Sequence, residues 1–335
     1  MARVAIVFTG GTIASLPDAA TGAAMPTLDG EAILARIPGI TDLADLEPID
    51  RGLVSASHMS FTQIVESAGV LQAALDRDDV DGAVLAQGTD SIEETAFAYD
   101  LLVRSDKPVV VVGAMRTSAD PAWDGPRNLR DAVRVASAPS LAGQGALVVM
   151  GGLILPADDA VKLHSQADDA FGAPNSGSLG AVGEAGVRLT RERGPRRRLV
   201  GTPLAAAEPC YLVTATVGLD GSLVRAMRRL RPAGLVIAAS GAGNTHPDLL
   251  DACREAMTDE VAVALTTRCC AGRTAPAYGF PGGGARWLEA GAMPTGHLGG
   301  PKARVALALG LGSDLKAGDL ADFLADPPGW HQSSR

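Results

Sequence analysis

Short apolar runs alternate with amphipathic segments along the first 150 residues. The apolar runs are typical of strands buried in a parallel sheet, and they lie at 4–8, 82–87, 109–113 and 146–150. The segments between them have the polar and apolar spacing of helices, which are predicted at 29–37, 60–77, 91–104 and 127–135. This order predicts a mostly parallel sheet with helices on both faces.

Three of these helices carry start signals. Asp29 is predicted to cap the first helix with its side chain. Ser60 is followed three residues later by Gln63, and Ser91 by Glu94, and each pair has the pattern of a capping box.

The alternation weakens over 151–208, where Gly, Asp, Ser and Arg predict short strands and loops, and then resumes. Later strands are predicted at 211–215, 235–239 and 261–265, and later helices at 248–257, 302–309 and 319–324. We therefore expect two α/β domains, a larger one over 1–195 and a smaller one over 210–335, joined by a linker at 196–209.

Composition narrows the class of protein. The 335 residues are 47% hydrophobic and 20% charged, which indicates a globular protein with a sizeable core and roughly two domains. The net charge of −9 argues against nucleic acid as a partner, and no apolar stretch reaches the ~18 residues that span a bilayer. The basic run at 191–198 has a Gly-Pro centre and is interpreted as a solvated interdomain turn.

Cysteine usage and the N-terminus favour a cytoplasmic location. The four cysteines form no CxxC pair, so free, reduced thiols are expected, and no cluster of metal-ligating residues suggests a metal or another cofactor. The chain begins with a strand pattern and has no signal-peptide form.

The segment 9–15 follows the first predicted strand and is the first candidate for chemistry. Gly10 and Gly11 allow a sharp turn, and Thr9 and Thr12 flank them at the edge of the sheet where α/β proteins bind ligands. A hydroxyl held there on a stiff β-branched side chain is a candidate nucleophile. The alternative is a Gly-rich turn that starts a loop or holds a phosphate.

The segment 87–91 occupies the same kind of position after a later strand. Thr89 and Asp90 lie beside the N-terminus of a predicted helix, where backbone amides can hold a negative group or a developing oxyanion. Asp90 can bind an amino group, or Asp90 and Ser91 can be plain helix caps. Lys162 lies in a segment that contains no other basic residue. It is either a base for a threonine hydroxyl or an ordinary surface lysine.

In combination these motifs resemble the bacterial-type L-asparaginase/glutaminase family. The matching segments are 9–12, 87–94, 113–116, 124–129, Lys162 and 241–244. The resemblance covers nearly the whole chain and is weakest over 16–56 and 165–210. It implies a flavodoxin-like parallel sheet in the larger domain and a homodimer or homotetramer.

The resemblance also implies roles for individual residues. Thr12 would attack an amide carbonyl, Thr89 would be a second essential hydroxyl tuned by Lys162, and Asp90 would bind the substrate's amino group. The oxyanion donors would be the Thr89 backbone amide and Ala114. The predicted substrate-binding set is Gly11, Ser57, His58, Gly88, Thr89, Asp90 and Ala114. Within it, His58 is either a polar contact near the substrate or a capping or solvent-facing histidine. The family needs no metal.

The chain departs from the family at three points. The loop at 20–27 lacks the tyrosine that family members place near the nucleophile. The sequence therefore does not identify the group that activates Thr12. Tyr278 is the one tyrosine expected in a loop. The serine of the carboxylate site is shifted, with Ser57 preferred and Ser55 the alternative. The loop at 277–284 lacks the acid that members lend to a neighbouring subunit, and Glu289 is the nearest candidate.

These observations predict an amidohydrolase that converts L-asparagine, or a related amide, to the acid and ammonia through a threonine acyl-enzyme. A preference for glutamine, a D-amino acid amide or a substituted amide or imide is an alternative within the class, because one methylene changes selectivity by only ~1–3 kcal/mol. The competing classes are a non-catalytic module that binds a small ligand and an amidotransferase subunit that acts on charged transfer RNA.

Overall fold

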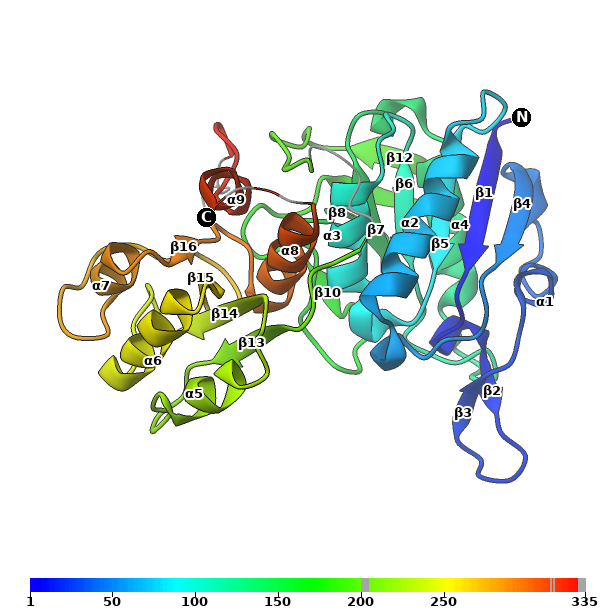
Figure 1. Cartoon of the computed structure of the whole chain (residues 1–335). Coiled ribbons are helices and arrows are strands. Elements are labelled where there is room, and N and C mark those ends of the chain that lie inside the picture. The colour runs from blue at the N-terminus through cyan, green and yellow to red at the C-terminus, as the bar shows by residue number, and fades with distance from the viewer. Residues whose placement is uncertain (200–204, 314, 316, 331–335) are drawn as a thin grey trace. The chain divides into compact units, whose positions relative to one another are not determined.

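The computed structural model describes residues 1–199, 205–313, 315 and 317–330. The chain separates into two units, Met1–Arg193 and Gly194–Arg335 (Figure 1). The predicted linker at 196–209 includes 200–204, which lie outside the described residues.

The N-terminal unit is built on an eight-stranded sheet within the described residues, in the order β12-β11-β8-β7-β6-β5-β1-β4. Its parallel strands are β1 (Arg3–Phe8), β4 (Asp45–Asp50), β5 (Gly82–Ala86), β6 (Val109–Val112) and β7 (Ala146–Met150). The antiparallel edge is formed by β8 (Leu153–Pro156), β11 (Gly180–Gly183) and β12 (Gly186–Leu189). The parallel strands have the flavodoxin-like order 2-1-3-4-5 along the chain, which places the topological switch point between β1 and β5.

Helices cover both faces of this sheet, as predicted. α2 (Phe61–Leu75) and α3 (Ile92–Leu102) lie on one face, and α1 (Gly30–Leu34) and α4 (Gly125–Ala136) on the other (Figure 1). The caps of two helices are confirmed, because Asp29 accepts a hydrogen bond from the Ala32 amide and Ser60 forms a capping box with Gln63.

The capping box predicted at Ser91 is wrong. Ser91 makes no side-chain cap, because a 3-10 turn at Thr89–Ser91 precedes α3 and the Ser91 hydroxyl accepts a hydrogen bond from the Gln87 amide instead. Gln87 directly follows β5 and is buried, so its side-chain amide needs an acceptor within the protein. The turn that carries Thr89 is thereby tied to the end of β5.

The C-terminal unit contains a second, four-stranded parallel sheet among the described residues. Its strands, in order, are β13 (Cys210–Thr214), β14 (Gly234–Ala239), β15 (Ala262–Thr267) and β16 (Met293–Pro294). Its helices are α5 (Ser222–Arg228), α6 (Pro247–Thr258), α7 (Gly284–Glu289), α8 (Gly300–Gly312) and α9 (Ala317–Leu324). The predicted combination of a larger and a smaller α/β unit is confirmed.

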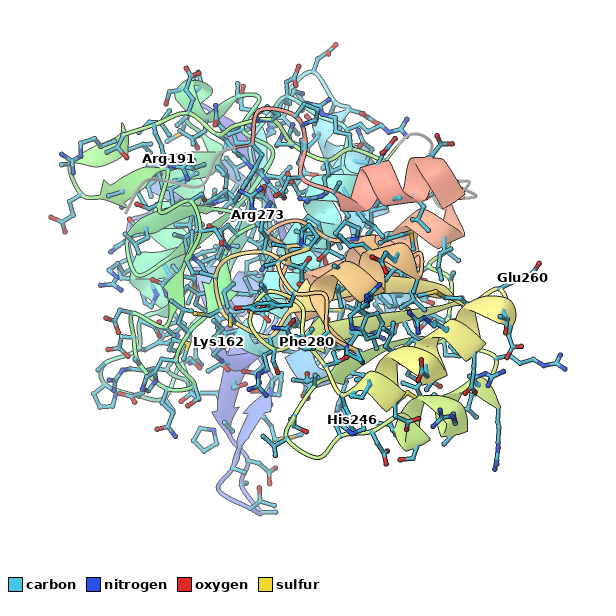
Figure 2. The ribbon with its side chains drawn as sticks, turned by 90° about the vertical axis from the view of Figure 1, so that its left-hand side faces the viewer. Lys162, Arg191, His246, Glu260, Arg273 and Phe280 are labelled. Atoms are coloured by element: carbon cyan, nitrogen blue, oxygen red, sulfur yellow. The ribbon has the colours of Figure 1, made fainter. Side chains whose placement is uncertain are left out.

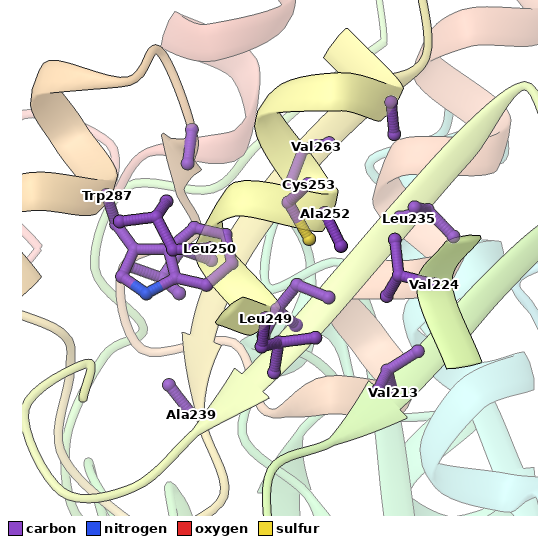
Figure 3. Close-up of a cluster of buried hydrophobic side chains, with 14 of the residues drawn as sticks. Val213, Val224, Leu235, Ala239, Leu249, Leu250, Ala252, Cys253, Val263 and Trp287 are labelled. Carbon is purple, nitrogen blue, oxygen red and sulfur yellow. The ribbon is translucent and has the colours of Figure 1, made fainter. Parts of the chain in front are cut away.

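A cluster of buried side chains holds α5, α6 and α7 against one face of this second sheet (Figure 3). Val224 from α5, Leu249 from α6 and Trp287 from α7 are fully buried in it. The Trp287 indole donates a hydrogen bond to the Thr245 hydroxyl at 3.0 Å, so its polar atom is satisfied. Apart from Trp287 and Cys253, the buried side chains of the cluster are aliphatic.

Candidate active site

The turns that follow β1 and β5 touch each other at the switch point of the first sheet. A Cβ atom on Gly11 would lie 2.1 Å from the backbone nitrogen of Gly88, and one on Gly10 would lie 2.7 Å from the nitrogen of Val54. Both Gly10 and Gly11 have positive φ angles, 99° and 81°. Glycine is therefore required at both positions for the two chain segments to pack.

Thr9 and Thr12 have different environments. The Thr9 side chain is buried and donates to the carbonyl of Ala86 at 3.3 Å, which joins β1 to β5. Thr12 begins the 3-10 turn Thr12–Ala14 and is half-buried, and its hydroxyl makes no hydrogen bond with any residue that the structure describes. Ser15 fixes the turn because its hydroxyl donates to the Gly11 carbonyl at 2.8 Å. The free hydroxyl in this turn is that of Thr12.

Lys162 lies between Thr89 and Asp90. Its Nζ is 2.9 Å from Thr89 Oγ1 and 2.6 Å from Asp90 Oδ1. The lysine side chain is 15% exposed and Thr89 is buried, whereas Asp90 is 70% exposed. The structure thus brings together a shielded hydroxyl, an amine and a carboxylate that is open to solvent.

A short strand pair outside the main sheet carries Lys162. β9 (Val161–Lys162) pairs antiparallel with β10 (Phe171–Gly172), and Lys162 is labelled in Figure 2. The Lys162 amide also donates to the Glu93 carboxylate at 3.2 Å. Glu93 was not among the sequence-based candidates, since nothing near it in the chain indicates a partner 69 residues away.

The loop after β6 contacts Thr89. A Cβ atom on Gly113 would lie 2.8 Å from Thr89 Cγ2, so the backbone before Ala114 packs directly on the second threonine. Asp124 accepts hydrogen bonds from the amides of Met115 and Arg116 at 3.0 and 2.9 Å. Ala114 is fully buried within this loop.

Two of the matched motifs have structural roles in the same loop. Asn128 donates to the Gly113 carbonyl and to Asp124, which closes the turn at the start of α4. Arg116 forms an ion pair with Asp168 at 2.9 Å and lowers the pKa of that carboxyl. The segments 113–116 and 124–129 therefore support each other around Ala114.

The segment with the two candidate serines lies against Gly88. A Cβ atom on Gly88 would lie 2.7 Å from Ala56 Cβ, within the 3-10 turn Ala56–His58. Ser57 and His58 are exposed on this turn, and Ser55 is half-buried at its start. The turn thus lies beside the Gly11–Gly88 contact.

The region predicted as a loop at 20–27 is partly a β-hairpin. β3 (Ala24–Pro26) pairs with β2 (Ser15–Pro17), and Gly22 in the tip has a φ of 70°. The hairpin contains no tyrosine. Of the three tyrosines, Tyr99 is fully buried in α3, Tyr211 lies in β13 and Tyr278 is exposed in a loop of the C-terminal unit.

The C-terminal motif at 241–244 organises its own unit. Asn244 Oδ1 accepts a hydrogen bond from the Gly284 amide at 3.3 Å, which ties the turn after β14 to the start of α7. Glu289, at the end of α7, forms an exposed ion pair with Arg286.

The part of the chain that the structure describes contains no group of three or more His, Cys, Asp or Glu that could hold a metal ion. None of its helices is long and apolar enough to cross a bilayer.

Two family models match the chain over most of its length. Residues 3–194 match the model described as "Asparaginase, N-terminal", and residues 211–324 match "Glutaminase/Asparaginase C-terminal domain". The matches cover the eight-stranded sheet, the second sheet except for Cys210, and all of the motif segments described above.

Individual proteins agree with the family models. A "Probable L-asparaginase" of Deinococcus radiodurans is 36% identical over 315 residues, which cover 91% of each chain. A "Probable L-asparaginase periplasmic" of Haemophilus influenzae is 30% identical and covers 92% of this chain and 88% of its own. The crystal structure of a "Probable Cytoplasmic L-asparaginase from Campylobacter jejuni" is 28% identical, has a TM-score of 0.85 and covers 97% of this chain and 99% of that chain.

Proposed function

Because the chain belongs to the asparaginase family, we propose that it hydrolyses the side-chain amide of L-asparagine with Thr12 as the nucleophile. The protein is a hydrolase of carbon–nitrogen bonds in linear amides. The resemblance inferred from the motifs is thereby confirmed. The roles of individual residues are proposed from the family resemblance together with the geometry given above.

The contact of Lys162 with both Thr89 and Asp90 carries the proposal. A lysine, a hydroxyl and a carboxylate at 2.6–2.9 Å form a proton-handling group whose logic is similar to that of a Ser-His-Asp triad. Asp90, which is exposed on one side, is free to bind the ammonium group of an amino-acid substrate. The Thr89 backbone amide and Ala114 complete the proposed set as oxyanion donors.

The proposed reaction has two steps that balance without a cofactor. Thr12 Oγ1 bonds to the amide carbon, the carbon–nitrogen bond breaks, and the hydroxyl proton leaves with the nitrogen as ammonia. Water then attacks the ester, releasing the acid and restoring the hydroxyl. Gly11, Gly88, Ser57 and His58 line the approach, with the serine proposed to bind the substrate's α-carboxylate.

Ammonia release from a panel of amides tests the proposal. The panel contains L-asparagine, D-asparagine, L-glutamine and an N-substituted asparagine, and we expect the highest kcat/KM with L-asparagine. Faster turnover of another amide in the panel would identify that amide as the preferred substrate and leave the proposed hydrolysis by Thr12 unchanged. Silence across the panel from folded protein would leave a binding module as the better account.

We further propose a cytoplasmic homodimer or homotetramer. Cys269 and Cys270 are exposed and unbridged, as thiols in a reducing compartment are. Tyr278 and Phe280 are about half-exposed neighbours in the 272–284 loop, where Phe280 is labelled in Figure 2, and exposed aromatic side chains are typical of interfaces. Light scattering after size exclusion distinguishes these assemblies from a monomer.

A further inference from the structure

Lys162 depends on its connecting turn for its position. β9 has two residues and pairs with β10, and neither strand belongs to the eight-stranded sheet. The segment 157–160 joins β9 to β8, the nearest strand of that sheet. Together with β10 and the Glu93 carboxylate, whatever holds this segment therefore determines the placement of the lysine amine.

A buried ion cluster holds Asp158 in that segment. Arg193 Nη2 lies 2.8 Å from Asp158 Oδ1 and 2.7 Å from Asp100 Oδ2. The three side chains are only 4%, 8% and 1% exposed, in the order Arg193, Asp158, Asp100. Burial would lower the pKa of Arg193, but the two carboxylates raise it, so the guanidinium stays charged. Separating a buried charge from its partner is strongly unfavourable, which fixes Asp158 against Arg193.

The next residue is held from a different direction. The Asp159 carboxylate accepts hydrogen bonds from the Asn175 amide and side chain and from the amide and hydroxyl of Ser176, at 2.6–3.2 Å. Two adjacent carboxylates with separate partners restrain both the position and the rotation of the turn. Lys162 leaves this turn three residues after Asp159.

We propose that Asp158, anchored by Arg193, is a positioning residue for Lys162. The inference rests on the proposed role of Lys162 in the amide hydrolysis. Lys162 must hold contacts of 2.9 and 2.6 Å to two partners at once, and a displacement of about 1 Å at such a site costs on the order of 100-fold in rate. Loss of the Asp158–Arg193 contact is expected to lower kcat and to leave substrate binding largely unchanged.

Asp158→Asn is the direct test, with Asp100→Asn as its matched control. Each variant removes one carboxylate charge and leaves the other paired with Arg193, so the guanidinium keeps an ion pair in both. Asp158→Asn is expected to lower kcat about 10- to 100-fold, with KM changed less than about threefold. Asp100→Asn is expected to keep kcat within about twofold, because the contact of Arg193 with Asp158, the cluster member that lies in the turn, is retained.

A double variant separates positioning from a general loss of structure. Adding Asp158→Asn to Lys162→Met should lower kcat no further, because the residue that it positions is already gone. A further loss in that background, or equal losses from the two Asn variants, overturns the inference.

The crystal structure of the Asp158→Asn variant gives a readout that does not depend on turnover. Lys162 Nζ should lie beyond hydrogen-bond distance of Thr89 Oγ1. A lysine that stays at 2.9 Å overturns the inference even if the wild type proves inactive on amides. Absence of wild-type turnover with a displaced lysine would contradict the proposed function and leave the positioning role standing.

Discussion

The backbones of Gly11 and Gly88 are in direct contact across the switch point of the N-terminal sheet. A methyl group on Gly11 would lie 2.1 Å from the nitrogen of Gly88, far inside van der Waals distance. This contact brings the turn that carries Thr12 next to the turn that carries Thr89. The two threonines lie on adjacent turns because neither glycine has a side chain.

Gly11→Ala should therefore separate the two turns. The φ of 81° and the clash with backbone atoms leave no place for the added methyl group, so we expect a loss of stability of about 2–4 kcal/mol and a large fall in kcat. Gly143→Ala is the control, since Gly143, which lies before β7 and outside the site, also has a positive φ but no atom within 4 Å of the added carbon. It should cost about 1 kcal/mol and leave kcat unchanged. Urea unfolding and ammonia release measure both, and a fully active Gly11→Ala variant would contradict the account.

Lys162→Met and Thr89→Val should each lower kcat by about 100- to 10,000-fold, the range for loss of a proton-transfer group. Because the two side chains are hydrogen-bonded, the double variant should be little worse than either single one. Thr9→Val is the matched control, since this buried threonine joins two strands and should affect unfolding free energy more than kcat. Steady-state kinetics in which the losses simply multiply would show that Lys162 and Thr89 act separately.

The two serines near Gly88 can be distinguished by KM. Ser57→Ala is expected to raise KM about 10- to 100-fold, the effect of losing a hydrogen bond to a charged carboxylate, with a smaller change in kcat. Ser55→Ala should change KM less than about threefold, because Ser55 starts the turn and is half-buried. The reverse order would assign the carboxylate to Ser55.

The loss of folding stability at acid pH should arise in part from Asp326 in the C-terminal unit. Burial raises the pKa of its carboxyl, but hydrogen bonds from His297 and the Arg197 charge outweigh burial and lower the pKa to about 2. A folded-state pKa below the ordinary 3.8 means that the ionised group stabilises the fold by about 2 kcal/mol above pH 4, and that this is lost as the pH falls toward 2.

Urea unfolding between pH 7 and pH 2.5 measures this contribution. Asp326→Asn should be less stable than the wild type at pH 7, and the difference should shrink at the acid end. Asp251→Asn is the control, because its exposed ion pair with Arg254 is worth at most about 1 kcal/mol. A difference for Asp326→Asn that is constant with pH would contradict the assigned pKa.

Local patterns were enough to predict the buried strands and two of the helix caps. The strands at 109–112 and 146–150 are continuous apolar runs, and Ser60 with Gln63 needs no distant partner. β4 was missed because Asp45–Asp50 is a half-exposed edge strand with no apolar run. α5 and α7 were also missed, since each is short and depends on packing against the second sheet.

The site was predictable where a motif marks it and not where distant residues support it. Thr12, Thr89 and Lys162 were identified from segments whose spacing resembles a family. The partners that hold Lys162 were not, because Glu93 is 69 residues away from it and Arg193 is 93 residues from Asp100. Such contacts depend on the folded topology and leave no periodic signal in the chain.

The most direct test of the account is to trap the covalent intermediate. Protein mixed with L-asparagine and quenched in acid within one turnover should carry an added mass equal to asparagine less ammonia, and the peptide that bears it should contain Thr12. Thr12→Ala should show neither the added mass nor turnover, while its unfolding curve stays close to that of the wild type. An adduct on Thr89, or rapid hydrolysis by folded Thr12→Ala protein, would contradict the claim that Thr12 is the nucleophile.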